Sequence, residues 1–194
     1  MVRRQLGGVA HIYIGLPTKA SDTQKVGRSG NVLTVRSLTG TDIDANELET
    51  VSFSDRDVEK YRAAAGDVLL SARSTSLKTA IVPKELDGIV VNATLLGVRC
   101  LSALEPRLLV AWLNHPEGRA ALESVAQSGT AQMNITVAGL SKLEVPVPPP
   151  DVQKWMVKLL EAADEAYAAA IKAAGDRRRL AGHIVIAQLM NTRS

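Results

Sequence analysis

The chain contains a single cysteine, Cys100, among its 194 residues, and only 3% of its residues are aromatic. One cysteine cannot form a disulfide within the chain, so we expect a reduced, cytoplasmic setting. Few aromatic side chains leave few platforms for unpaired bases, which argues against a single-strand or RNA-binding module built on stacking. Because 46% of the residues are hydrophobic, the sequence still predicts a folded domain with an aliphatic core.

Long apolar runs are also absent, since no segment approaches the roughly 20 residues that span a bilayer, and no membrane partner is expected. The net charge is only +3. Basic residues dominate residues 1–36, however, and acidic residues dominate residues 37–67. A polyanion could bind the first segment, because contacts between Lys or Arg and phosphate release counterions. A mixed solvated surface is the alternative interpretation of the same charges.

Several motifs that carry chemistry are missing. There is no Gly-rich phosphate loop and no G-x-S-x-G motif, and His11, His115 and His183 lack metal-ligand spacing. The run of prolines 148–150 lacks the polar first residue and aromatic fourth residue of the amino-methyltransferase tetrapeptide, and no Asp or Glu has a Lys two positions later, as many nucleases do. We therefore expect a non-catalytic chain without a metal or cofactor, whose partner supplies any chemistry.

The apolar patterns predict an α+β fold. Short strands are expected at 9–14, 32–36, 48–53, 68–71, 79–82, 89–91, 93–99 and 143–147, with short helices at 104–113 and from Pro116 to near Gly129. From Asp151 a three–four spacing predicts a long helix with Gly175-Asp176 as an interruption. The expected organisation is a mixed, small-sheet domain at 1–149 and, at 150–194, a helical arm suited to helix-pair or coiled-coil packing.

Six segments carry a resemblance to a known family. They are Leu6–Ile12 with Gly15, Val35–Leu38, Gly66–Thr75, Leu108–Leu113 with Gly118, Ser128–Gln132 and Leu140–Pro148. Their order and spacing resemble the target recognition domain of the specificity (S) subunit of type I restriction–modification systems, over nearly the whole chain. Ser74 departs from the pattern, because family members often have Gly there. The usual S subunit has two recognition domains and two long helices, so this chain, with one of each, resembles half an S subunit.

The resemblance implies a DNA-reading role without catalysis. In that family the S subunit binds double-stranded DNA and holds modification subunits, which transfer methyl groups from S-adenosylmethionine to adenine; restriction subunits can join. The arm would pair with a second copy, as a homodimer, or with another half S subunit. A symmetric pair should read an inverted, bipartite site. The alternative is a protein-interaction adaptor that uses the Ala-rich arm and the acidic segment 37–67.

Candidate residues follow from the chemistry of DNA contacts. Arg suits guanine and Asn or Gln suits adenine, so the base-reading candidates are Arg28, Asn31, Arg36, Arg73, Gln132 and Asn134. Phosphate contacts need only charge or a small donor, so those candidates are Lys19, Lys25, Ser74, Thr75, Lys78 and Thr130. The assembly candidates on the arm are Trp155, Leu159, Ala162, Ala166, Tyr167 and Ala170. Ordinary solvated loop positions are the alternative for each DNA candidate.

Overall fold

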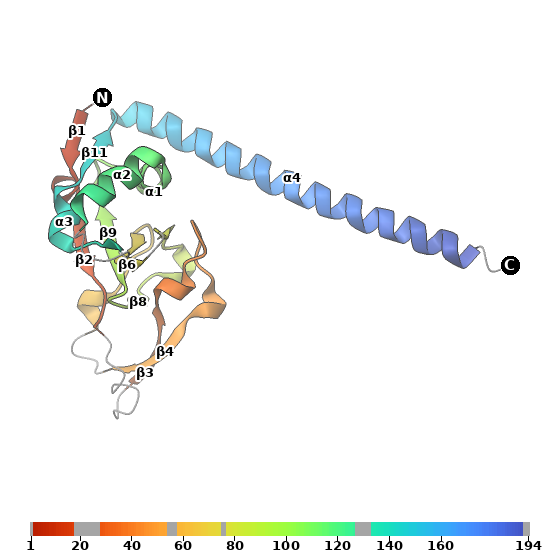
Figure 1. The fold of residues 1–194 in the computed structure, drawn as a ribbon, viewed down its shortest axis with the longest axis horizontal. Helices are drawn as coiled ribbons and strands as arrows, with labels where there is room; N and C mark the ends of the chain where they lie inside the picture. Colours follow the sequence, from red (N-terminus) through yellow and green to blue (C-terminus); the bar gives the residue numbers. More distant parts are fainter. Residues whose placement is uncertain (1, 18–27, 54–57, 75–76, 127–132, 192–194) are drawn as a thin grey trace. The chain divides into compact units, whose positions relative to one another are not determined.

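The computed structural model describes residues 2–17, 28–53, 58–74, 77–126 and 133–191 (Figure 1). By its internal contacts the chain divides into two units, Met1–Gln153 and Lys154–Ser194. The first unit, which we call the head, combines small sheets with short helices. The second belongs to one long helix. This is the α+β organisation that the sequence predicts.

A four-stranded antiparallel sheet forms the centre of the head. Its order is β2 (Ala10–Ile14), β9 (Leu95–Cys100), β5 (Val68–Ser71) and β7 (Thr79–Ile81). All four residues of β5 are buried, because both faces of this sheet are covered. Val68 and Leu70 point to one hydrophobic cluster and Leu69 points to another, as the alternation of a strand requires.

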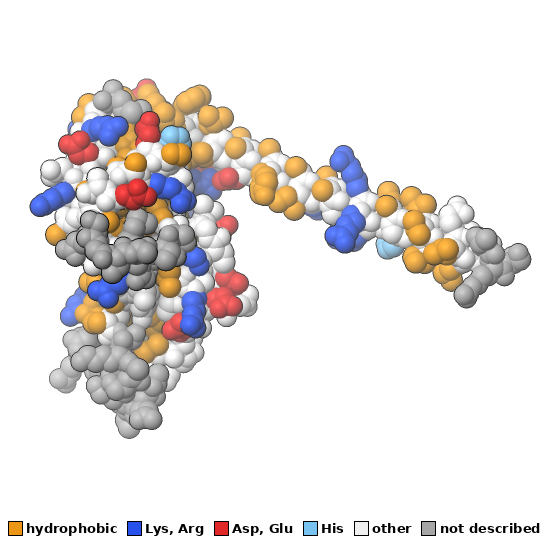
Figure 2. Space-filling model, viewed as in Figure 1, with side chains coloured by type: hydrophobic (Ala, Val, Ile, Leu, Met, Phe, Trp, Pro, Cys, Tyr) orange, Lys and Arg blue, Asp and Glu red, His pale blue; other side chains and the backbone are white. Residues whose placement is uncertain are grey.

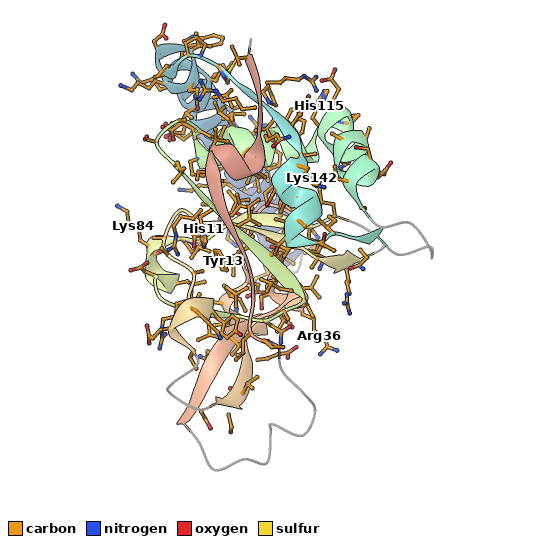
Figure 3. All side chains as sticks on the ribbon, turned by 90° about the vertical axis from the view of Figure 1, so that its left-hand side faces the viewer. His11, Tyr13, Arg36, Lys84, His115 and Lys142 are labelled. Atoms are coloured by element: carbon orange, nitrogen blue, oxygen red, sulfur yellow. The ribbon has the colours of Figure 1, made fainter. Side chains whose placement is uncertain are left out.

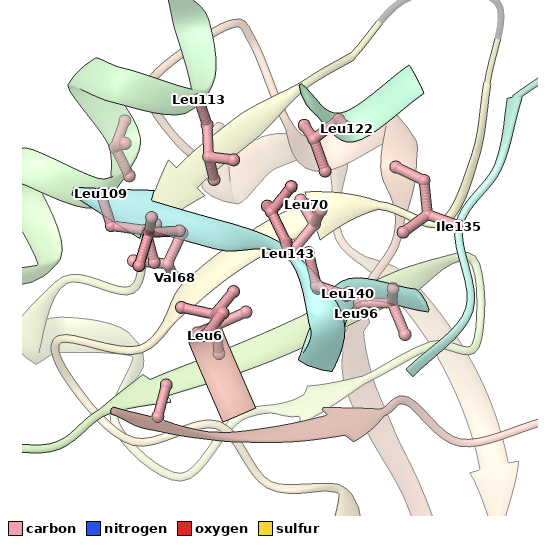
Figure 4. Close-up of a cluster of buried hydrophobic side chains, with 14 of the residues drawn as sticks. Leu6, Val68, Leu70, Leu96, Leu109, Leu113, Leu122, Ile135, Leu140 and Leu143 are labelled. Carbon is pink, nitrogen blue, oxygen red and sulfur yellow. The ribbon is translucent and has the colours of Figure 1, made fainter. Parts of the chain in front are cut away.

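Three helices, α1 (Pro106–Asn114), α2 (Pro116–Val125) and α3 (Val137–Lys142), contribute to the larger cluster. Leu109, Leu113, Leu122 and Leu140 are fully or almost fully buried there, together with Leu6 from the short turn η1 (Leu6–Gly8) (Figure 4). The members of this core are aliphatic, which confirms the expectation from composition.

The other cluster lies between the central sheet and a second, three-stranded sheet. That sheet has the order β4 (Glu49–Phe53), β3 (Arg28–Leu33) and β8 (Val90–Val91), with β3 parallel to β8. Single 3-10 turns link its strands to the rest of the head: η3 (Val35–Ser37), η4 (Ala45–Glu47), η5 (Glu59–Tyr61) and η6 (Lys84–Leu86). Two further antiparallel ribbons pair β1 (Val2–Gln5) with β11 (Glu144–Val147), and β6 (Arg73–Ser74) with β10 (Met133–Asn134).

Several local predictions were wrong. The expected strand at 32–36 ends at Leu33, because Thr34 caps η3 through a reciprocal capping box with Ser37. The ribbon strand β1 was missed because its four residues are exposed and polar or charged, apart from Val2. The helix α3 was missed because six residues are too short to show a helical period.

The helix α4 (Pro150–Asn191) is 42 residues long, or roughly 63 Å at 1.5 Å per residue. Pro150 starts it without losing an intrahelical hydrogen bond, and Asp151 lies in its positive first turn. The helix continues through Gly175, so the predicted interruption is wrong. In the described residues, no helix is long and apolar enough to cross a membrane.

The start of α4 is held to the head by a buried glutamine. Gln153 is 3% exposed. Its amide nitrogen donates to the carbonyls of Ala103 and Pro148, both at 2.8 Å, and its amide oxygen accepts from the backbone N–H of Glu105 at 2.9 Å. Three side-chain hydrogen bonds therefore fix the first turn of the helix against the loop before α1.

Candidate nucleic-acid interface

Two of the base-reading candidates lie opposite each other on the ribbon β6–β10. Arg73 pairs in register with Asn134, and its Nε donates to Asn134 Oδ1 at 3.4 Å. The backbone N–H of Ile135 donates to the carbonyl of Ala72 at 2.8 Å, which ties the two strands together at their base. The ribbon thus joins a cation and an amide that come from sequence positions 61 residues apart.

Arg36 lies in the turn η3, which directly follows β3 of the three-stranded sheet. Its side chain is 78% exposed and points away from the protein backbone (Figure 3). One guanidinium nitrogen lies 3.9 Å from Glu49 Oε1. The backbone N–H of Arg36 donates to Thr34 Oγ1, so the turn itself is capped. An ion pair this long and this exposed contributes little to stability, and the guanidinium keeps donors for a ligand.

Lys78 is bonded to the same turn. Its ammonium donates to the carbonyl of Val35 at 3.3 Å, and its backbone N–H donates to the buried hydroxyl of Ser71 at 3.1 Å. Lys78 therefore brings the segment before β7 next to the Arg36 turn. An ammonium has three donors, so two remain for a phosphate or for water.

Thr94 connects the Arg36 turn to the β6–β10 ribbon. Its hydroxyl accepts from the backbone N–H of Val35 at 3.3 Å, and its carbonyl accepts from the backbone N–H of Ala72 at 2.9 Å. We call Arg36, Arg73, Lys78 and Asn134, joined through Thr94 and its partners, the reading cluster. Hydrogen bonds to the backbone of Val35, Ala72 and Ile135 tie together the segments that carry these four sequence-predicted residues. Thr94 itself was missed, because an exposed Thr in a loop gives no signal in a single sequence.

Asn31 occupies a different place. It lies exposed on β3 opposite Thr50, whose hydroxyl donates to Asn31 Oδ1 at 3.3 Å. Arg28 is at the other end of the same strand and Ser74 is on β6, but their side chains lie outside the described part of the structure. The remaining candidates also lie outside the described residues: Lys19, Lys25, Thr75, Thr130 and Gln132.

A buried carboxylate pairs with a half-exposed arginine at the other end of β5 from Arg73. Asp67 is 2% exposed and accepts from Arg99 Nε at 2.9 Å, Arg99 Nη2 at 2.8 Å, Tyr13 Oη at 2.7 Å and the backbone N–H of Ala64 at 2.9 Å. Its hydrogen bond raises the pKa of Arg99, against a smaller opposing effect of burial. Burial, and then the hydrogen bond to Asp67, raise the pKa of Tyr13 well above its usual value.

This network explains the Gly-Asp pair at the start of β5. Gly66 has a φ of +89°, a left-handed conformation that a side chain disfavours, and the turn lets Asp67 point inward. Tyr13 lies flat over Gly97, where an added Cβ would be 2.0 Å from the Tyr13 ring. The Gly-Asp pair is therefore structural, whereas Arg73 farther along the same segment reaches the surface.

Four acids of the segment 37–67 have partners within the head. Asp44 caps η4 by accepting from the backbone N–H of Asn46 at 2.9 Å, and Glu59 pairs with Arg62 at 2.9 Å. Thr34 donates to Glu49 at 3.4 Å, and Asp67 is buried. These four acids of the segment therefore have partners within the head.

The described residues offer little for catalysis. No group of three His, Cys, Asp or Glu that could hold a metal ion occurs among them. Burial raises the pKa of Cys100 to about 12, so its thiol stays protonated at neutral pH and is a poor nucleophile. It lines a cavity of about 180 Å³ with Asp67 and Arg99, but both of those side chains are already paired with each other.

The helix α4 presents apolar side chains that a single chain leaves exposed. Trp155 is 62% exposed, Leu159 56% and Tyr167 70%, and the alanines at 162, 166 and 170 are exposed too. Figure 2 shows hydrophobic side chains along the length of this helix. Such a stripe is typical of a helix that packs against another helix, and its alanines permit close approach.

The features so far define a class of protein: an α+β head with exposed Arg, Lys and Asn side chains, a long apolar-striped helix, and no evident catalytic group in the described residues. The chain belongs to the type I restriction modification DNA specificity domain family, whose model matches residues 1–174. A curated relative, the MjaX type I restriction enzyme specificity subunit of Methanocaldococcus jannaschii, is 25% identical over 166 residues. That match covers 83% of this chain and 39% of the relative, so the chain spans about two fifths of the relative's length.

Solved structures show the same fold. The HsdS subunit of Thermoanaerobacter tengcongensis matches with a TM-score of 0.62 at 20% identity, over 87% of this chain and 43% of that one. A chain from a type I restriction–modification system, solved to explain complex assembly and conformational transition, matches with a TM-score of 0.64 at 21% identity, over 89% and 40%. The S subunit of M. genitalium matches with a TM-score of 0.53 at 14% identity. At these identities the likeness concerns the fold alone.

Proposed function

We propose that this chain reads a DNA sequence for a type I modification complex, without performing chemistry itself. The observation that carries the proposal is the reading cluster, which gathers Arg36, Arg73, Lys78 and Asn134 at the surface of a family-typical head. Arg and Asn can donate and accept in pairs at the major-groove edges of guanine and adenine. Lys78 holds the backbone beside Arg36 through the carbonyl of Val35.

The partner subunits supply the reaction in this proposal. A modification subunit transfers a methyl group from S-adenosylmethionine to adenine, with or without an added restriction subunit, in the cytoplasm. This chain contributes only position and sequence choice, so methyl transfer to DNA should require both proteins. Purified chain incubated with S-adenosylmethionine and DNA, but without the modification subunit, should give no methylated adenine. Methylation by the chain alone would overturn the division of roles.

Duplex binding is the direct test. Binding of the complex to DNA should weaken linearly in a plot of log affinity against log salt, because each neutralised phosphate releases counterions. An Arg73→Ala variant should bind its specific duplex about 1–3 kcal/mol more weakly and should tolerate other base pairs at one position of the site. Lys84→Ala is the control, because Lys84 is an exposed cation in η6 and lies outside the reading cluster; Figure 3 shows it on the left of the view and Arg36 on the right. It should leave both affinity and specificity unchanged.

The outcome of this test separates DNA reading from a protein-adaptor role. Equal affinity of the complex for every duplex would exclude sequence reading. Complex formation that depends on α4, together with no duplex binding at low salt, would favour the adaptor. Either result would leave the family fold intact while removing the function proposed for it.

We further propose that α4 pairs antiparallel with a second copy of this chain. An acidic group (Glu161, Asp164 and Glu165) precedes the middle of the helix, and a basic group (Arg177, Arg178 and Arg179) follows it. Glu161 and Arg179 are equally far in sequence from Ala170, which lies near the centre of α4. Full antiparallel overlap therefore brings each acidic group to the level of the partner's basic group, whereas parallel overlap places like charges together. Complementary flanking charges select orientation in paired helices.

Cysteine cross-linking distinguishes the two orientations. Antiparallel overlap centred on Ala170 brings position 154 of one copy near position 186 of the other. Mixing Lys154→Cys with Ile186→Cys should give a mixed disulfide, while each variant alone should cross-link poorly. Efficient cross-linking of each variant with itself would show parallel pairing, and a monomer at all concentrations would point to another half subunit as the partner. An antiparallel homodimer should read an inverted, bipartite site, because its two-fold symmetry is mirrored in the DNA.

A further inference from the structure

Both backbone polar groups of Val35, its N–H and its carbonyl, form hydrogen bonds with residues far away in the sequence. Its N–H donates to Thr94 Oγ1, and its carbonyl accepts from Lys78 Nζ, both at 3.3 Å. Thr94 precedes β9 and Lys78 precedes β7, so segments leading into the two strands that flank β5 in the central sheet hold the turn that carries Arg36. We call this arrangement the Val35 clamp.

Thr94 is itself fixed in place. Its N–H donates to Asn92 Oδ1 at 2.8 Å, and Asn92 is only 6% exposed; the N–H of Asn92 donates to the carbonyl of Leu33 at 2.8 Å. The clamp therefore rests on a buried amide at the edge of the second sheet.

The same residue fixes the second reading element. The carbonyl of Thr94 accepts from Ala72 N–H at 2.9 Å, and the carbonyl of Ala72 accepts from Ile135 N–H at 2.8 Å. Ala72 is followed directly by Arg73, and Ile135 directly follows Asn134. One continuous path of hydrogen bonds thus sets the spacing between Arg36 and the Arg73–Asn134 pair.

Base reading is demanding in geometry, because a recognition residue must be held within about 0.5 Å of its productive position. Phosphate binding tolerates more freedom, since it needs only charge near the backbone. Loss of the clamp should therefore affect the choice between base pairs more than the overall attraction to DNA.

We propose that Thr94 and Lys78 are positioning residues that set the sequence specificity of this chain by clamping the Val35 peptide. This inference rests on the proposed DNA-reading function and deepens it. It also changes the role predicted for Lys78, which was a phosphate contact in the sequence interpretation. In the clamp, its ammonium acts on a protein carbonyl.

The test compares Thr94→Val, which removes the hydroxyl, with Thr94→Ser, which keeps it. Each variant is assembled with its modification subunit and titrated with the specific duplex, identified from the methylated site in host DNA, and with duplexes that carry one substituted base pair. Thr94→Val should lose roughly tenfold in affinity for the specific duplex, comparable to losing one base contact, while its non-specific affinity and its salt slope stay unchanged. Thr94→Ser should restore discrimination.

Lys78→Met adds a second, independent readout, with Lys84→Met as its control. The clamp predicts reduced discrimination with an unchanged salt slope. A phosphate contact predicts instead a uniform loss across all duplexes and a slope smaller by about one. That second pattern would overturn the role assigned to Lys78.

The controls separate failure of the clamp from failure of the function. Urea unfolding of each variant shows whether the head remains folded, and Lys78→Met carries the test if Thr94→Val does not fold. If the unaltered complex discriminates between duplexes and Thr94→Val does so equally well, the clamp proposal is wrong and DNA reading stands. If the unaltered complex shows no discrimination, DNA reading itself is wrong.

Discussion

The buried ion pair of the head gives the sharpest test of what holds the fold together. In Asp67→Asn the side chain keeps its shape but loses the charge that accepts from Tyr13, from Ala64 and twice from Arg99. Removing one partner of a buried ion pair costs about 3–5 kcal/mol, because the other charge is left without compensation. The side chain of Arg99 is 46% exposed and can rehydrate, so we expect the lower end, about 3 kcal/mol.

The free energy of unfolding can be measured by urea titration. Trp112 packs against the main hydrophobic cluster of the head, so its fluorescence in a Trp155→Phe background reports the head rather than α4. With a denaturant slope of about 2 kcal/mol/M, Asp67→Asn should lower the urea midpoint by roughly 1.5 M.

Glu59→Gln is the matched control. Glu59 also pairs with an arginine, Arg62, at 2.9 Å, but the two side chains are 78% and 40% exposed. An exposed pair contributes at most about 1 kcal/mol, since water competes for both charges. Should Asp67→Asn cost no more than Glu59→Gln, burial would not be what makes the Asp67 pair important, and the account of the Gly-Asp pair would fail.

Three further predictions concern single positions. Gln153→Leu leaves two carbonyls and one N–H without their partner and should lower the free energy of unfolding by about 3 kcal/mol in the same urea assay, while Gln5→Leu on exposed β1 should have little effect. Gly175→Ala adds a Cβ into open space within α4 and should raise helix stability by about 0.5–1 kcal/mol, seen as a higher melting temperature at 222 nm. Because the folded head raises the pKa of Tyr13, its unfolded form releases the proton first, so stability should fall as pH rises above 10.0, more steeply than in Tyr13→Phe.

The sequence predicts strands best where burial imposes a pattern. The strands β5, β7 and β9 and the helices α1 and α2 agree with their predicted ranges to within a few residues. Elements with little burial were missed, such as β1, or displaced, such as β3. Local hydrogen bonds rather than hydrophobic pattern set these elements, and a capping box such as that of Thr34 gives only a weak signal in sequence.

The candidate site could be predicted only in part, for a related reason. The chemistry of DNA contacts selects residue types, so Arg36, Arg73, Lys78 and Asn134 could be named from the sequence. Their spacing depends on hydrogen bonds between backbone groups far apart in the chain, such as that from Ala72 to Thr94. Such bonds leave no trace in residue type, because any residue at position 72 except proline could donate.

In the proposed function, stability and base reading depend on different residues of the head. The groups that fix the frame, Asp67 and Gln153, are almost fully buried, whereas Arg36 and Arg73 are exposed and contribute little to packing. A substitution at Arg36 or Arg73 should therefore change sequence preference at a stability cost within about 0.5 kcal/mol, as for other exposed positions. Thr94 is the exception that joins the two groups, because it is exposed yet bonded to the frame through Asn92. A variant of Thr94 should therefore alter specificity although Thr94 contacts no base. A variant of either arginine would change specificity whether or not the arginines are held at a fixed spacing. Only Thr94 therefore tests whether the reading residues act as one positioned surface or as independent cations.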